Sequence, residues 1–247
     1  MTDKIALEKP GAFSLVLNFL PLAHLASGAM VTFAGFDTAG QRLACLLAWV
    51  YLLPPLVARL TLAALGTPGG HLTQDSRGYR VWWFLTQWQM LFNRLPWLEE
   101  LLRLVPGLYA LWIGLWGGRL SPLAYVGPGV VITDRYLVHV EKGAVLGLRS
   151  TLAGHMVIRG AQGRYLVVVA VPTVEAEAIV GGYAGLGPGA TLRAGHLLPT
   201  GRRIAPFDAW PRHGQGNEEP MNAIHHPGSA SADAGLRPGL KNQVHRP

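Results

Sequence analysis

A six-residue repeat runs through the second half of the chain and limits what that half can fold into. Aliphatic residues recur there at every sixth position. An α-helix would spread such residues around its whole circumference, whereas a coil of three short strands points all of them inward. The pattern therefore predicts a parallel β-helix of about five coils, with an aliphatic ladder as its core. The repeating residues are Val126, Ile132 and Val138; Val140, Leu146, Leu152 and Ile158; and Val174, Val180, Leu186, Leu192, Leu198 and Ile204.

The repeat is interrupted twice. Its register slips by two residues between Val138 and Val140, which predicts a bulge or a loop at that point. Between Ile158 and Val174 lies a longer insertion with glycines and a β-branched run, and this composition predicts a protruding hairpin.

The first half of the chain is apolar enough to enter a bilayer. Only 14% of all residues are charged, whereas an average soluble domain carries about 25%. Gly11 to Gly35 contains no charged residue and is long enough as a helix to cross the hydrocarbon core. Leu43 to Ala58 is a second span, provided that Arg59 snorkels or faces protein. We expect a transmembrane helical hairpin over residues 1–66.

The segment 67–120 is predicted to form amphipathic or interfacial helices. Tyr79 to Arg103 is typical of a helix divided at Pro96, and it carries many tryptophans. These aromatic side chains either lie at the lipid headgroup boundary or pack on the membrane hairpin. Pro106 to Leu120 is too short to span comfortably, so we expect a re-entrant or interfacial helix. The β-helix follows over 121–207, and 208–247 is expected to be a disordered or extended tail.

Two blocks of the repeat resemble a known family. LGLRSTLAGHMV (146–157) and VEAEAIVGGYAGLGPGATLRAGHLLPTG (174–201), with the insertion between them, are similar to the hexapeptide-repeat acyltransferases, which include the galactoside and serine acetyltransferases. NRLPWLEELLRLVPGLYALWIGLWGGRL (93–120) looks like the lead-in of membrane-linked hexapeptide domains, such as those of some non-ribosomal peptide synthetases. The resemblance implies an α + β protein in which the helical part precedes a left-handed parallel β-helix.

The resemblance also implies a chemistry. In that family a histidine just before the insertion is the catalytic base, and the matching residue is His155. The donor is an acyl-CoA or an acyl carrier protein, whose pantetheine arm would lie near Gly185, Gly187 and Arg193. The family forms trimers, so a homotrimer is expected, and the insertion would help cover the acceptor.

Other readings of the same residues stay open. His155 is alternatively a turn histidine without a task, and His139 and His196 also lie on the β-helix. Three histidines on such a fold occur in γ-class carbonic anhydrases, but the H-x4-H ligand pair is absent, so no metal site is expected. The net charge of +7 fits anionic lipid headgroups or an acidic cofactor, and no nucleic acid is expected as a partner.

Two functions are therefore weighed. The first is a membrane-associated acyltransferase that moves an acyl group from a thioester to a hydroxyl or amine. The second is a catalytically inactive accessory subunit of a larger membrane complex; TGRRIAPFDAW (200–210) favours it, because this segment lacks the family's donor-binding turn. Either would lie in a membrane, with membrane lipid as a partner. We expect a bacterial inner membrane with the β-helix on the cytoplasmic side, because arginines follow the hairpin.

Overall fold

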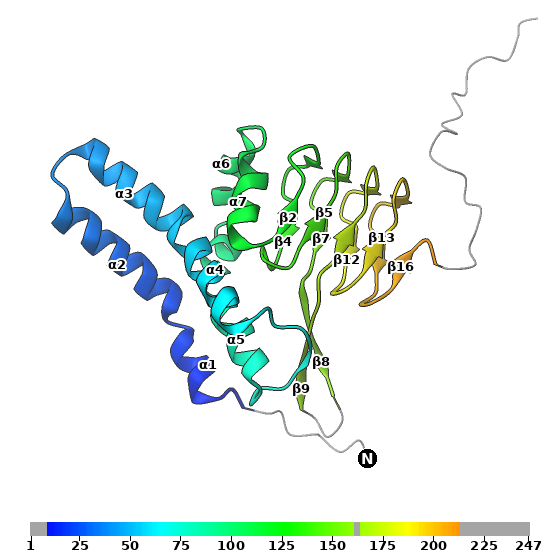
Figure 1. Cartoon of the computed structure of the whole chain (residues 1–247), viewed down its shortest axis with the longest axis horizontal. Helices are drawn as coiled ribbons and strands as arrows, with labels where there is room; N and C mark the ends of the chain where they lie inside the picture. The colour runs from blue at the N-terminus through cyan, green and yellow to red at the C-terminus, as the bar shows by residue number, and fades with distance from the viewer. Residues whose placement is uncertain (1–8, 161–163, 213–247) are drawn as a thin grey trace, which may run out of the picture.

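The chain forms an N-terminal helical part that packs against one end of a parallel β-solenoid (Figure 1). The computed structural model describes residues 9–160 and 164–212. The first four helices make a long hairpin that projects away from the solenoid, and the next three fill the space between them. The helices of the hairpin are α1 (Ala12–Leu17), α2 (Leu20–Gly35), α3 (Ala39–Tyr51) and α4 (Leu53–Leu65).

The turn of the helical hairpin is shorter than the sequence predicts. It holds only the residues between α2 and α3, because Thr38 starts α3 with a capping box in which its side chain and that of Gln41 cap each other's backbone. Arg42, placed in the loop by the prediction, lies in α3, where its Nε donates to the carbonyl of Phe36 at 2.8 Å. Each arm of the hairpin is interrupted once, shortly before Pro21 and before Pro54.

Three further helices follow: α5 (Arg77–Arg94), α6 (Trp97–Arg103) and α7 (Leu108–Trp116). The predicted division at Pro96 is confirmed. The aromatic side chains of α5 pack inside the protein: Trp82 and Phe92 are buried, and Trp88 contacts His24 of α2. Trp88 thus packs on the hairpin, as one of the two alternatives predicts, whereas Trp97 of α6 is 55% exposed. The segment before α5 also forms a short strand, β1 (Gly70–Leu72), which the sequence analysis did not predict.

The repeat folds into three parallel sheets that form the sides of a prism. Each coil contributes one two-residue strand to each sheet. The sheet that starts with β2 contains β2 (Arg119–Leu120), β5 (His139–Val140), β10 (Thr173–Val174), β13 (Thr191–Leu192) and β16 (Ala209–Trp210). The second sheet contains β3 (Tyr125–Val126), β6 (Val145–Leu146), β11 (Ile179–Val180) and β14 (Leu197–Leu198). The third contains β4 (Val131–Ile132), β7 (Thr151–Leu152), β12 (Gly185–Leu186) and β15 (Arg203–Ile204).

The second residue of each strand forms the aliphatic ladder, as the period of six predicts. Leu146, Leu152, Val180 and Leu198, for example, are fully buried. Two predicted members do not belong to it. Val138 is buried in a corner rather than in a strand of the prism, and Ile158 lies in the protruding hairpin. The register shift arises because the corner between β4 and β5 holds six residues, 133–138, where the corner after β12 holds four.

The insertion forms the predicted hairpin, with strands β8 (His155–Arg159) and β9 (Tyr165–Val169). It leaves the prism at the corner between the sheet of β4 and the sheet of β2, which we call the hairpin corner (residues 133–138, 153–160, 164–172, 187–190 and 205–208). β1 pairs with β9 in antiparallel register, so the hairpin is held to the helical part.

The solenoid extends beyond its predicted end at residue 207. Ala209 and Trp210 form β16 on the last coil, and the carboxylate of Asp208 pairs with Arg212 at 2.8 Å. The remainder of the predicted tail, 213–247, lies outside the described residues.

Candidate functional site

A histidine and an aspartate from adjacent coils meet at the hairpin corner. Nδ1 of His155 lies 2.6 Å from Oδ2 of Asp134. Asp134 belongs to the enlarged corner of the first coil, and His155 begins β8 at the same corner of the next coil. Coil stacking therefore joins two residues that are 21 positions apart in the chain.

The aspartate is fixed by its surroundings. Its side chain has no solvent exposure, and Oδ2 also accepts a hydrogen bond from the Thr133 hydroxyl at 2.6 Å. The Thr133 oxygen in turn accepts one from the backbone N–H of Gly154 at 3.2 Å. Gly154 is needed at this contact, because a Cβ there would lie 2.8 Å from Cβ of Asp134.

The histidine is held on two sides and open on a third. Its imidazole meets the ring of Trp82 edge-on, with 5.0 Å between centroids. The side chain keeps 25% of its exposure, so solvent or a substrate can reach it. Because Nδ1 is engaged by Asp134, Nε2 is the ring atom left to exchange a proton.

Two opposing effects set the protonation of His155. Burial lowers the pKa of His155, but the hydrogen bond to Asp134 and the charge of that carboxylate outweigh burial. The pKa of His155 therefore lies above the ordinary value for histidine. A neutral imidazole with a raised pKa is a stronger base, and its protonated form is stabilised by the carboxylate behind it.

A buried polar network anchors the same corner to the helices. Arg135, which is 2% exposed, makes a salt bridge with Glu99 of α6, and its Nε donates to Glu99 Oε1 at 2.7 Å. Its backbone N–H donates to Gln89 Oε1 at 2.6 Å. The other oxygen of Glu99 accepts from Tyr109 at 2.6 Å and from Arg103 at 3.1 Å. The residue after Asp134 in the chain, Arg135, is thus held in place by α5, α6 and α7.

The predicted donor residues do not all lie at one corner. Gly185 lies in strand β12 of the sheet of β4, and Gly187 follows at the hairpin corner, one coil beyond His155. A Cβ on Gly187 would meet the backbone nitrogen of Pro206 at 3.0 Å. Arg193 follows β13 and lies at the next corner, where its Nε donates to the carbonyl of Pro211 at 3.4 Å.

The other histidines of the solenoid stand apart from the dyad of His155 and Asp134. His139 lies on β5 with Nε2 3.8 Å from a carboxylate oxygen of Glu141, and His196 contacts the carbonyl of Ala194 at 2.8 Å. Across residues 9–160 and 164–212, no three His, Cys, Asp or Glu side chains gather closely enough to hold a metal ion.

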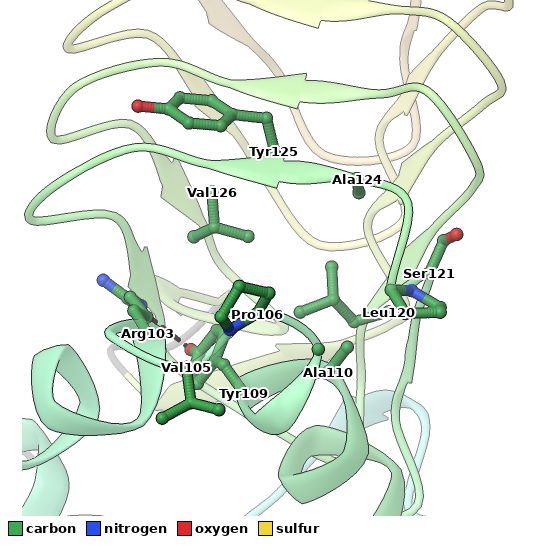
Figure 2. Close-up of a pocket in the computed structure, with 12 residues that line it drawn as sticks. Arg103, Val105, Pro106, Tyr109, Ala110, Leu120, Ser121, Ala124, Tyr125 and Val126 are labelled. Atoms are coloured by element: carbon green, nitrogen blue, oxygen red, sulfur yellow. Dashed lines mark hydrogen bonds between the residues drawn. The ribbon is translucent and has the colours of Figure 1, made fainter.

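A pocket of ≈ 280 Å³ lies at the open end of the first coil, where the α6–α7 connection meets the β2–β3 corner (Figure 2). Tyr109, Leu120 and Val126 are among its lining residues. Among the described residues that line it, Arg103 alone is charged, and that guanidinium is already bonded to Tyr109, Glu99 and Glu100. Neither His155 nor Asp134 lines this pocket.

The sequence analysis identified His155 and missed Asp134 and Trp82. Neither partner has a fixed spacing from the histidine, because both contacts depend on tertiary stacking. One signal pointed to Asp134. The polar run Thr133–Arg135 lies inside the repeat at the enlarged corner, although the register slip first shows at Val140, six residues after Asp134.

Comparisons with known proteins find similar solved structures only. No protein-family model matches the chain, and no curated protein matches it. The chain is similar to serine acetyltransferase isoform 3 from Entamoeba histolytica, solved in complex with cysteine, at 12% identity and a TM-score of 0.24, covering 83% of this chain and 84% of that chain. It is also similar to serine acetyltransferase from Neisseria gonorrhoeae at 11% identity and a TM-score of 0.29, covering 79% and 89%.

Both similar structures are enzymes, and serine acetyltransferases were among the proteins that the repeat resembles. At these TM-scores the likeness carries no argument about this chain's site. The narrower resemblance to domains of non-ribosomal peptide synthetases stays a prediction.

Proposed function

We propose that the chain is a membrane-associated acyltransferase in which His155 is the general base. The observation that carries this proposal is the dyad: a partly exposed imidazole with a buried carboxylate 2.6 Å behind it, at a corner of a parallel β-solenoid. A turn histidine without a catalytic role would need no such carboxylate. The other support is the resemblance of the repeat to the hexapeptide acyltransferases.

The reaction is a direct transfer from a thioester. Nε2 of His155 removes the proton from an acceptor hydroxyl or amine, and the acceptor attacks the thioester carbonyl. Asp134 stabilises the imidazolium that forms. The tetrahedral intermediate then collapses, the carbon–sulfur bond breaks, and His155 returns the proton to the departing thiolate. The products are an ester or amide and a free thiol.

The donor would be acyl-CoA or an acyl carrier protein, lying along the hairpin corner. We assign the pantetheine arm to the coil beyond His155, which holds Gly185 and Gly187. Arg193 is one corner further along, so we assign it to the phosphate end of the donor. The proposed assembly is a homotrimer.

Membrane attachment is the second part of the proposal. Ala12–Gly35 and Ala39–Leu65 are long and apolar enough to cross a bilayer, by length and composition. A core helix of a soluble protein would be mostly buried, whereas only 17% of the most apolar window of each stretch is buried within the protein. Large apolar side chains are exposed along both arms: Phe13, Leu15, Val16, Phe19, Leu22, Leu25, Met30, Phe33, Leu43, Leu47, Leu52, Leu56, Leu60 and Leu65.

Arg59 fits such an arrangement. Its side chain lies beside Gly117, at the C-terminal end of α7, where a cation interacts favourably with the helix dipole. With the hairpin inserted, the solenoid would lie on the cytoplasmic side, where thioester donors are made available.

The test is acyl transfer by the purified protein in lipid nanodiscs, followed as thiol release from acetyl-CoA in the presence of membrane lipid. We expect His155→Gln to lower the rate by about 10²- to 10⁴-fold, the usual contribution of general base catalysis. His139→Gln is the matched control, because that histidine lies on the same solenoid outside the dyad. Undiminished turnover in His155→Gln would rule out His155 as the base, and absence of turnover in the natural protein would favour the inactive accessory subunit instead.

A further inference from the structure

A second cavity lies beside the dyad, between the helices and the hairpin. It has a volume of ≈ 260 Å³ and is enclosed by α1, α5 and the two strands β8 and β9. Its wall is mostly apolar and aromatic. Residues that line it include Tyr79, Trp82 and Trp83 of α5 and Val157 and Val167 of the hairpin.

The cavity and His155 share one face of the hairpin. Side chains alternate along a strand, so His155 and Val157 point to the same side of β8. Across the ladder, Val157 pairs with Val167 and His155 pairs with Val169. Trp82 lines the cavity and also contacts the imidazole of His155. A ligand in the cavity would therefore end next to the dyad.

Two of the aromatic residues in the wall, Tyr79 and Trp83, have their polar atoms satisfied by protein, whereas the buried indole N–H of Trp82 has no hydrogen-bond partner among the described residues. The indole N–H of Trp83 donates to the carbonyl of Ser14 at 3.2 Å, and the Tyr79 hydroxyl lies 3.1 Å from the Ser14 hydroxyl. Tyr79 and Trp83 stack with 6.1 Å between ring centroids. What these residues offer to a ligand is consequently their apolar ring surface.

One wall of the cavity belongs to the start of the first candidate span. Ser14 and Asn18 line it, and on the same stretch Phe13, Val16 and Phe19 are 44%, 70% and 69% exposed. Those three side chains would face lipid in the proposed membrane arrangement. In that arrangement the cavity would have the bilayer on one side and the dyad on the other.

We propose that this cavity binds the apolar segment of a membrane amphiphile whose hydroxyl or amine is the acyl acceptor. The inference rests on the proposed function and names its acceptor class. Pockets for whole drug-sized ligands run from roughly 300 to 1,000 Å³, so ≈ 260 Å³ suits the part of an amphiphile next to its reacting group, with the rest of the chain left in lipid.

The test is photolabelling with an octadecanol that carries a diazirine near its hydroxyl, in phosphatidylcholine nanodiscs without donor. We expect crosslinks on α5 and on the hairpin strands at the cavity. Val157→Trp, which fills the cavity from the exposed edge of β8, should lower this labelling by about tenfold, the equivalent of about 1.4 kcal/mol of binding.

Met156→Trp is the matched control. It places the same indole on the opposite face of β8, so labelling at the cavity should be unchanged. Equal melting temperatures for the two variants would show that both retain the fold. Labelling confined to the exposed faces of α2, α3 and α4, or equal labelling in both variants, would overturn the inference.

A His155→Gln variant separates this inference from the proposed function. Binding in the cavity needs no base, so we expect this variant to keep its labelling while it loses transfer. If transfer is lost but the cavity is never labelled, the proposed function stands and the acceptor class is wrong. If His155→Gln retains transfer, the proposed function fails, and the acceptor role of the cavity fails with it.

Discussion

Asp134 is the residue that gives His155 its chemical character. Burial alone would lower the pKa of the imidazole, and the neighbouring carboxylate reverses this effect. The folded protein therefore binds a proton at His155 more tightly than the unfolded chain does. The resulting stabilisation is complete below the ordinary pKa near 6.5 and is lost as the pH rises through the raised folded value.

Asp134→Asn should reverse this pH dependence. Only burial would then act on the imidazole, so its pKa should fall below the ordinary value. We predict that the difference in melting temperature between the natural protein and the variant is largest near pH 6. It should shrink towards pH 9, as the pH passes through the range in which a histidine titrates. A difference that grows with pH would contradict the pairing.

Gly154 makes room for the dyad. A Cβ at this position would lie 2.9 Å from Oδ2 of Asp134, so Gly154→Ala should displace the carboxylate from His155. We expect acyl transfer to fall by about tenfold or more while the protein stays folded, since misplaced catalytic groups cost rate before stability. Gly182→Ala is the control, because its Cβ would meet its nearest neighbour at 3.4 Å. An equal loss in both variants would deny Gly154 this role.

At the scale of elements, one ion pair joins the helices to the solenoid. Arg135 lies at the hairpin corner of the first coil and Glu99 lies in α6. Their side chains are 2% and 6% exposed. The guanidinium also lies 5.5 Å from the ring centroid of Phe92. These contacts hold the enlarged corner, and with it Asp134, against α5 and α6.

Arg135→Ala should destabilise the protein strongly, because it leaves Glu99 buried with less compensation. We predict a decrease of about 3–5 kcal/mol in the free energy of unfolding, measured by chemical denaturation in detergent. Arg212→Ala removes a solvent-exposed ion pair with Asp208 and should leave the unfolding curve unchanged. Similar unfolding curves for the two variants would show that the ion pair between Arg135 and Glu99 does not stabilise the protein.

The aliphatic ladder stabilises the solenoid itself. Leu198 is fully buried in β14, whereas its neighbour Leu197 points outward and is 44% exposed. Leu198→Ala should lower the free energy of unfolding by about 2–5 kcal/mol, the usual result of emptying a core position. Leu197→Ala should change it far less. A larger loss of unfolding free energy in Leu197→Ala than in Leu198→Ala would mean that the register of the coils is wrong.

The strands were predictable from sequence because the repeat is local, and six residues return the chain to the next side of the prism wherever the coil is regular. The contact between β1 and β9 was not predictable, since an antiparallel pair between Gly70 and Val169 leaves no periodic trace. The same limit applies to Trp82. The helix that carries Trp82 was expected. Which side chain Trp82 would contact depends on how α5 packs against the rest of the protein.

At the scale of the whole molecule, the proposed membrane arrangement requires one orientation of the hairpin and the solenoid. The turn at Asp37 should lie on one side of the bilayer, and Thr67 and the solenoid on the other. The chain has a single cysteine, Cys45, so labelling is simple to design. A Cys45→Ser background carrying Asp37→Cys, Thr67→Cys or Lys142→Cys gives three reporters, one per variant.

We predict that a membrane-impermeant maleimide added to intact cells labels the Asp37→Cys variant and neither of the others. In inverted membrane vesicles the pattern should reverse. This outcome follows from two spans and from the cost of exposing unpaired backbone groups to lipid, which excludes half-inserted loops. Labelling of Asp37→Cys and Thr67→Cys from the same side would contradict a spanning hairpin.

The most direct test of the dyad is the pH dependence of acyl transfer. In the natural protein, kcat/KM should rise with pH through the raised pKa of His155, because the neutral imidazole is the active base. In Asp134→Asn the same rise should occur at lower pH, and the plateau should be lower because the carboxylate no longer stabilises the imidazolium. An unshifted profile in Asp134→Asn would contradict the claim that Asp134 and His155 act together as the catalytic base.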